Sequence, residues 1–180
     1  MEAKIKARFE DGQTAPFTWS PSDGGKPAFI CFRDALTEDL GSDPTGERFK
    51  TISGKMLSGA YYPADAVKFF GKHQDEHRLM RHGDRIQQIA PLGPISLWSM
   101  VEIYVAEQTD DTCTIGYVTT KKHHGRGIWT ATLTRKDNQL SLMVESTASP
   151  HSFLFWVGLP FARLLQLRAR RRAIEEFKKL

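Results

Sequence analysis

The sequence SPHSFLFWVGLPFARLLQLRARRRAIEEFKKL, residues 149–180, carries the longest helical pattern in the chain. Its apolar residues recur at steps of three or four, which places them on one helical face: Ala162, Leu165, Ala169, Ala173, Phe177 and Leu180. A second apolar line widens that face: Phe161, Leu164, Leu167 and Ile174. Gly158 and Pro160 interrupt the pattern, so we expect a long helix that begins near Pro160.

The same segment is strongly basic and starts with an apolar run. Its arginines and lysines either form the solvated outer face of a core helix or contact an acidic partner. Residues 153–162 are too few for the ~20 that span a bilayer, but they could lie in a membrane interface. The candidate residues for a protein or anionic membrane contact are Phe153, Phe155, Trp156, Arg168, Arg170 and Arg171.

The totals indicate one globular domain of ordinary composition. A chain of 180 residues is long enough for a sizeable core. The N-terminus has no apolar run, so no secretory signal is expected. Cys31 and Cys113 lack the spacing of metal ligands and are interpreted as free thiols of a reducing, cytoplasmic compartment. We expect no cofactor and no metal.

Charge is unevenly distributed along the chain. Residues 1–47 hold five Lys/Arg and nine Asp/Glu, whereas the remainder holds 20 basic and 12 acidic residues. Either the acidic front and the basic remainder attract each other, or the basic part faces an anionic partner.

Before residue 84 the pattern is mixed. Residues 4–10 alternate like a short strand, a second strand is expected at 28–32, and 36–47 is expected to be irregular. Residues 1–47 are therefore interpreted as a hairpin or loop-rich extension. Residues 49–57 are predicted as a strand and 63–80 as a helix.

From Asp84 onward the apolar period is two. Turn residues separate five predicted strands, at 85–89, 97–106, 112–120, 127–135 and 140–146. Such a meander followed by a long helix predicts an α+β domain over 48–180, in which a curved antiparallel sheet packs on the C-terminal helix, the helix-grip arrangement.

Two histidine motifs offer chemistry. His73 and His77 match the H-x-x-E-H pattern of an inverted zinc-protease motif, but no third ligand is evident, so we expect an exposed helix end. His123 and His124, among basic residues, occupy a predicted hairpin tip that is either an anion site or simply a basic turn. No RNA-binding signature accompanies the tip, so nucleic acid is not an expected partner.

Residues from about 49 to 180 resemble the "domain of unknown function 1990" family. The resemblance rests on Tyr117, Thr119, His123 and Gly127, and on a C-terminal pattern that includes Arg163 and Gln166. The sequence departs from the family pattern at Val118, Lys121, Lys122 and Ile128. The resemblance implies a START-like helix-grip fold and supplies no established activity or catalytic residues.

Three functional hypotheses follow. The first is a non-catalytic module that holds an apolar small molecule between sheet and helix, with its mouth near His123. Its candidate ligand-binding residues are Tyr117, Thr119, His123, Arg126, Trp129, Arg163 and Gln166. Apolar residues assigned to inward faces either line this pocket or close a solid core: Leu97, Met100, Ile103, Trp129 and Leu142.

The second hypothesis is a structural or assembly subunit that uses the basic helix and the N-terminal extension as contact surfaces. The third, an enzyme that uses His123 with Arg126 or Lys122, has the least support, so no catalytic residue is assigned.

Overall fold

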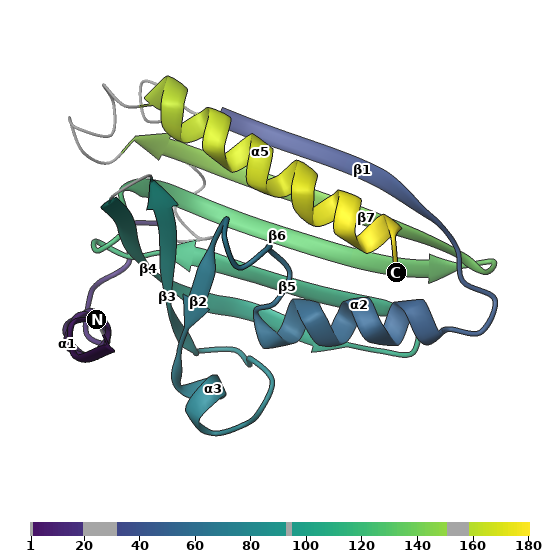
Figure 1. Ribbon diagram of the computed structural model, residues 1–180, viewed down its shortest axis with the longest axis horizontal. Helices are drawn as coiled ribbons and strands as arrows, with labels where there is room; N and C mark the ends of the chain where they lie inside the picture. Colours follow the sequence, from purple (N-terminus) through teal and green to yellow (C-terminus); the bar gives the residue numbers. More distant parts are fainter. Residues whose placement is uncertain (1, 20–31, 93–94, 151–158) are drawn as a thin grey trace.

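The computed structural model describes residues 2–19, 32–92, 95–150 and 159–180. Within them a seven-stranded, fully antiparallel sheet has the order β1-β7-β6-β5-β4-β3-β2 (Figure 1). The strands are β1 (Phe32–Ser42), β2 (Lys68–Phe70), β3 (Arg85–Leu92), β4 (Ile95–Gln108), β5 (Thr112–Thr119), β6 (Gly125–Lys136) and β7 (Gln139–Pro150). The helices are α1 (Glu2–Gly12), α2 (Glu47–Ser58), α3 (Lys72–Asp75) and α5 (Leu159–Lys178). The predicted α+β class, a curved antiparallel sheet with a long C-terminal helix, is confirmed.

All five strands predicted after Asp84 are present as β3 to β7, because alternation is a strong signal where one face of a sheet is buried. In β6 every second residue from Gly125 to Leu133 is buried. The link from β6 to β7 is a two-residue turn in which Asp137 and Asn138 have φ of 52° and 61°. Positive φ at both central residues matches the twist of a tight hairpin.

The prediction of a strand at 49–57 was wrong. Phe49, Ile52 and Met56 are spaced by three and four residues, and all three are buried on one face of helix α2. The carboxylate of Asp43 accepts hydrogen bonds from the backbone N–H groups of Arg48 (3.3 Å) and Phe49 (2.9 Å) at the N-terminus of α2. Gly59, with φ of 81°, ends the helix.

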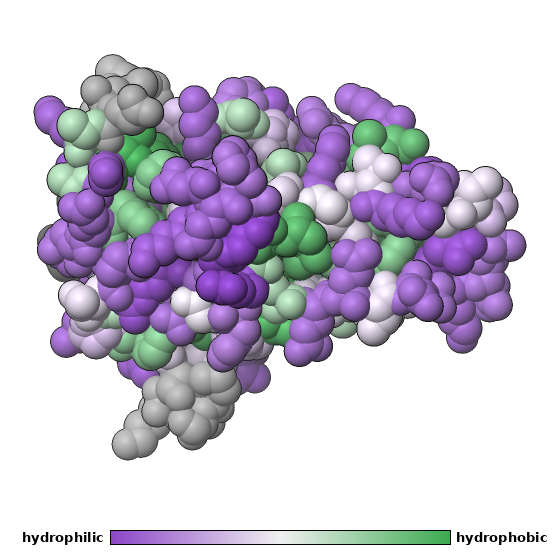
Figure 2. Space-filling view, turned by 90° about the horizontal axis from the view of Figure 1, so that it is seen from below, coloured by the Kyte–Doolittle hydropathy of each residue, from purple (hydrophilic) through white to green (hydrophobic). Residues whose placement is uncertain are grey.

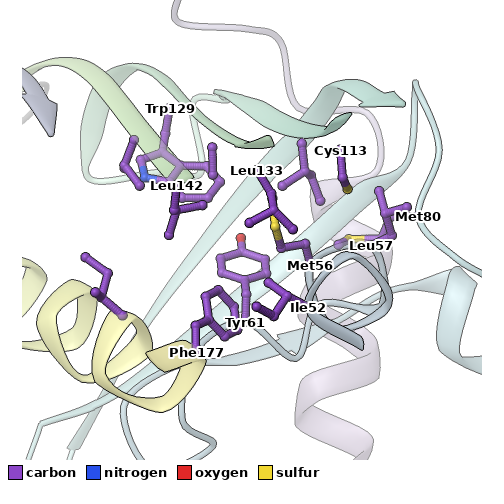
Figure 3. Packing of buried hydrophobic residues seen from close by; sticks show 14 of the residues in the cluster. Ile52, Met56, Leu57, Tyr61, Met80, Cys113, Trp129, Leu133, Leu142 and Phe177 are labelled. Carbon is purple, nitrogen blue, oxygen red and sulfur yellow. The ribbon is translucent and has the colours of Figure 1, made fainter. Parts of the chain in front are cut away.

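α2 and the last turns of α5 cover one end of the concave face of the sheet. Figure 3 shows Ile52 and Met56 of α2 and Phe177 of α5 around Tyr61, with side chains of the sheet opposite them. Ile52 and Leu133 have no exposed surface, and Phe177 keeps 3%. This end of the fold is a packed core.

Residues 1–47 differ from the predicted hairpin or loops. Residues 4–10 belong to helix α1, whose buried Phe9 packs edge-on against Phe70, with ring centroids 5.3 Å apart. β1 runs as far as Ser42, so most of 36–47 is an edge strand, with a bulge at Gly41, whose φ is 88°. Of the predicted strand at 28–32, only Phe32 lies within the described residues.

The predicted helix over 63–80 was also wrong. Phe69 and Phe70 alternate across strand β2: Phe69 belongs to the core on the concave face, and Phe70 meets α1 on the other face. Only the four residues of α3 are helical in this segment. His73 is 1% exposed and His77 has φ of 49°, so the two histidines are not an exposed helix end.

The long C-terminal helix is confirmed, with its start at Leu159. Three members of the predicted stripe, Ala169, Ala173 and Phe177, are buried, as is Ile174 of the second line. Two predictions for this face were wrong, because Leu164 is 61% exposed and Leu180 is 41% exposed.

Candidate functional site

A cavity of about 440 Å³ lies between the concave face of the sheet and residues 163–172 of α5. We call it the sheet–helix cavity. Its apolar lining residues come from both sides: Phe32, Ala66, Val67, Phe69, Ala90, Pro91, Leu97, Ala148, Leu165 and Ala169. Its polar and other lining residues are Tyr62, Asp65, Gln88, Ser99, Tyr117, His123, His124, Gly125, Ser149, Arg163, Gln166, Arg168 and Arg172.

Strand register places the floor of the cavity. Gln88 pairs with Ser99 and Ala90 pairs with Leu97 across β3 and β4, so these four side chains share one face. Tyr117 of β5 belongs to the same face, and all five line the cavity. Met100, one position on from Ser99, faces the opposite way, and the Cβ position of Gly12 in α1 lies against its methyl group. The inward orientation predicted for Met100 was therefore wrong.

A short polar chain crosses this floor. Ser99 Oγ donates a hydrogen bond to Gln88 Oε1 over 3.3 Å. Burial raises the pKa of Tyr117 to about 12, and a hydrogen bond from Gln88 offsets part of that rise. The phenol of Tyr117 therefore stays protonated at neutral pH and adds an O–H group to the floor, beside Gln88.

Aromatic rings form the inner end of the cavity. Tyr62 stacks on Phe69 with centroids 6.1 Å apart, and Tyr117 stacks on Trp129 at 5.2 Å. Burial also raises the pKa of Tyr62. Trp129 stacks in turn on Tyr61 at 5.4 Å, so Trp129 belongs to the core behind the cavity wall.

Ion pairs join α5 to both sides of the cavity. Arg163 pairs with Asp34 of β1 and donates a hydrogen bond to Gln166 over 3.1 Å. Arg172 donates two hydrogen bonds of 3.0 Å to the carboxylate of Asp65, which precedes β2. The hydrogen bond from Arg172 lowers the pKa of Asp65. The helix is thus fixed to the sheet edge and to the segment before β2.

Several ion pairs join the acidic first 47 residues to the basic remainder of the chain. Acidic residues of the first 47 pair with basic residues of the remainder at Asp34–Arg163, at Glu38–Lys178 (2.8 Å) and at Asp11–Lys122 (2.6 Å). The attraction between the acidic front and the basic remainder therefore acts at least partly within the chain. The face in Figure 2 is mostly hydrophilic, with small hydrophobic areas between charged side chains.

The structure brings four of the seven predicted ligand-binding residues to the cavity: Tyr117, His123, Arg163 and Gln166. Thr119 is buried and accepts a hydrogen bond from the Gly127 N–H over 2.8 Å, away from the lining. Arg126 and Trp129 are also not lining residues. Sequence reasoning missed Tyr62, Asp65 and Gln88, although β3 alternation was a usable signal for Gln88.

The predicted partner-contact residues are only partly described. Phe153, Phe155 and Trp156 lie outside the described residues. Arg168 is exposed at the cavity, Arg170 is half-buried, and the exposed Arg171 lies 3.5 Å from Glu175. The structure therefore leaves a contact role for these arginines as a prediction.

The remaining features bear on chemistry. No group of three His, Cys, Asp or Glu side chains arranged for a metal ion occurs among the described residues. Cys113 is a buried free thiol, whereas Cys31 lies outside the described part of the chain. No helix in the described ranges has the length and apolar character needed to cross a bilayer.

The comparisons with known proteins concern the fold. The sequence matches no family model and no curated protein, so the resemblance to the domain of unknown function 1990 family stays a prediction. Solved structures, however, share this arrangement. Hypothetical protein jhp0584 from Helicobacter pylori has a TM-score of 0.54 at 11% identity, over 89% of each chain. Human STARD10 has a TM-score of 0.51 at 9% identity, over 98% of this chain and 78% of that one.

The chain has a START-like helix-grip fold. A third structure, TTHA0849 from Thermus thermophilus, agrees, with a TM-score of 0.52 at 9% identity over 83% of this chain and 95% of that one. At such identities the likeness establishes the fold alone, because one fold carries many functions.

Proposed function

We propose that the chain is a non-catalytic binding module that holds an apolar small molecule in the sheet–helix cavity. The observation that carries the proposal is the cavity itself, about 440 Å³ and lined on both sides by apolar side chains. This volume falls in the range of roughly 300–1,000 Å³ typical of small-molecule sites. Each methylene group that moves from water into it contributes about 0.8 kcal/mol.

The polar groups of the floor support binding rather than catalysis. The hydroxyls of Ser99 and Tyr117 lie with the amide of Gln88, and an amide does not act as a general base. A few polar groups on the floor of a largely apolar cavity instead orient a bound molecule that carries an acceptor atom.

The test uses decanol, a neutral molecule with an aliphatic chain, and titration calorimetry. Ala90→Phe narrows the cavity from the sheet and Ala169→Phe narrows it from the helix, so each should weaken decanol binding about tenfold or more. Leu164→Phe, on the exposed face of α5, is the matched control and should bind like wild type. Failure of the wild type to bind decanol, or equal binding by all four proteins, would overturn the proposal.

The alternative function is a structural or assembly subunit that contacts a protein or an anionic membrane through α5 and the N-terminal segment. The exposed Arg168 and Arg171 favour it. Charge reversal at Arg170 and Arg171 should then weaken such a contact in a salt-dependent way. A pull-down and a liposome flotation at two salt concentrations measure it, and equal behaviour of wild type and variant would remove this support.

A further inference from the structure

We infer that the ligand of the sheet–helix cavity is an amphipathic anion, whose carboxylate or phosphate group binds Arg168 at the mouth while its apolar body occupies the interior. The inference rests on the proposed function, and it adds the charge of the ligand and the residue that selects it.

The arginines at the mouth of the cavity differ in whether the chain itself supplies a carboxylate partner. Three arginines of α5 line the cavity, and two of them are held within the chain: Arg163 by Asp34 and Arg172 by Asp65. Arg168 has no hydrogen bond or ion pair within the described residues, although its side chain lines the same cavity. The cavity therefore keeps one guanidinium group that no carboxylate of the described residues holds by a hydrogen bond or an ion pair.

Asp65 does not change this balance. The largest influence on its pKa is the hydrogen bond from Arg172, which lowers it, and the charge of Arg168 contributes less. Both carboxylate oxygens of Asp65 already accept hydrogen bonds from Arg172, one each, at 3.0 Å. Of the three arginines that line the cavity, Arg168 is therefore the one whose guanidinium group can bind a ligand oxygen.

The surroundings of Arg168 define the two parts of the ligand. Arg168 is exposed, so it borders solvent and an anion bound to it need not lose all its water. His123 and His124 of the β5–β6 turn line the same cavity, and the Nδ1 atom of His123 accepts a hydrogen bond from the Gly125 N–H over 2.9 Å. Further lining is apolar, with Val67, Phe69 and Leu97 among its members. A molecule that suits both regions has an anionic end and an aliphatic or aromatic body.

The experiment compares three probes with the same ten-carbon chain: decanoate and decyl phosphate, each below its micelle concentration, and decanol below its solubility limit. Wild-type protein should bind the better of the two anions about tenfold more tightly than decanol, and the preference between them identifies the head group. Arg168→Gln should reduce this advantage of the anions over decanol about tenfold, while Arg168→Lys should keep part of it. Arg171→Gln on the same helix, outside the lining, is the control and should behave like wild type.

The outcomes separate the two claims. If decanol and both anions bind wild type equally well, or if the anion advantage survives in Arg168→Gln, the ligand is not selected through Arg168 and this inference is wrong while the binding function stands. If no probe binds the wild-type protein, the proposed function fails and the inference fails with it.

Discussion

The helices cover the two ends of the concave face of the sheet differently. At one end, α2 and the last turns of α5 pack on it, with Tyr61 and Phe177 among the packed side chains (Figure 3). The space that remains between Tyr61, Ile174 and Phe177 is about 20 Å³. At the other end, residues 163–172 of α5 and the floor of β3, β4 and β5 line a cavity of about 440 Å³. The same helix therefore borders the cavity over residues 163–172 and packs into the core with its last turns, at Ala173, Ile174 and Phe177.

The two ends differ because α2 covers only the closed end of the concave face. Ile52 and Met56 of α2 fill the concave face at the closed end, whereas the segment that reaches the open end contributes short and partly exposed side chains such as Ala66 and Val67. Stability should therefore depend on the closed end and ligand binding on the open end.

The largest expected effect separates the two halves of α5. Phe177→Ala removes a side chain that is 3% exposed in the packed core, so it should lower the free energy of unfolding by about 3 kcal/mol. Leu165→Ala removes a half-buried side chain from the cavity wall and should cost about 1 kcal/mol. Urea denaturation measures both, and equal losses would mean that the two halves are not distinct.

A second prediction uses the tyrosine of the cavity floor at high pH. The folded protein raises the pKa of Tyr117 to about 12, so the unfolded chain releases this proton first, and stability should fall as the pH rises above about 10. Because the ring borders the cavity, the loss due to Tyr117 should be about 1 kcal/mol at pH 11. Urea denaturation of wild type and Tyr117→Phe between pH 9 and pH 11 tests this, with the shallower decline expected for the variant. Parallel declines would contradict the burial of this phenol.

The smallest expected effect concerns the attachment of α5 to the open end. The pair between Arg163 and Asp34 is partly buried, with 24% and 22% of the two side chains exposed. A double-mutant cycle with Arg163→Gln and Asp34→Asn should give a coupling energy of about 0.5–1 kcal/mol that decreases with added salt. A coupling energy of zero would show that this contact does not hold the helix over the cavity.

The fold was predictable from sequence where one period dominates. Alternation over 85–146 and the three-to-four spacing of Ala169, Ala173 and Phe177 predicted β3 to β7 and α5. Short segments gave wrong predictions. The alternation over residues 4–10 predicted a strand, but these residues form helix α1, whose Phe9 packs on the convex face of the sheet. Helical spacing at Phe49, Ile52 and Met56 was present, and Asp43, only six residues before Phe49, accepts hydrogen bonds at the start of the helix. The packing partners that favour the helix, such as Leu133 and Phe177, are distant in sequence.

The candidate site was half predictable. Tyr117 lies on the strand before the β5–β6 turn, and His123 lies in that turn, which is rich in lysine and histidine. Arg163 and Gln166 lie on a helix that the sequence predicts clearly. Tyr62 and Asp65 carry no local signal, because their place in the cavity depends on the fold of the segment before β2, whereas alternation along β3 was a usable signal for Gln88. Thr119 and Arg126 share the turn region but do not line the cavity.

The central claim is that the open end holds an apolar molecule and the closed end does not. The most direct measurement is a set of intermolecular NOEs between decanoate and the protein in solution. We expect NOEs from the aliphatic chain to Leu97, Tyr117 and Leu165, and none to Phe177 or Ile52. NOEs confined to the exposed face of α5 around Leu164, or to the side chains of the closed end, would contradict it.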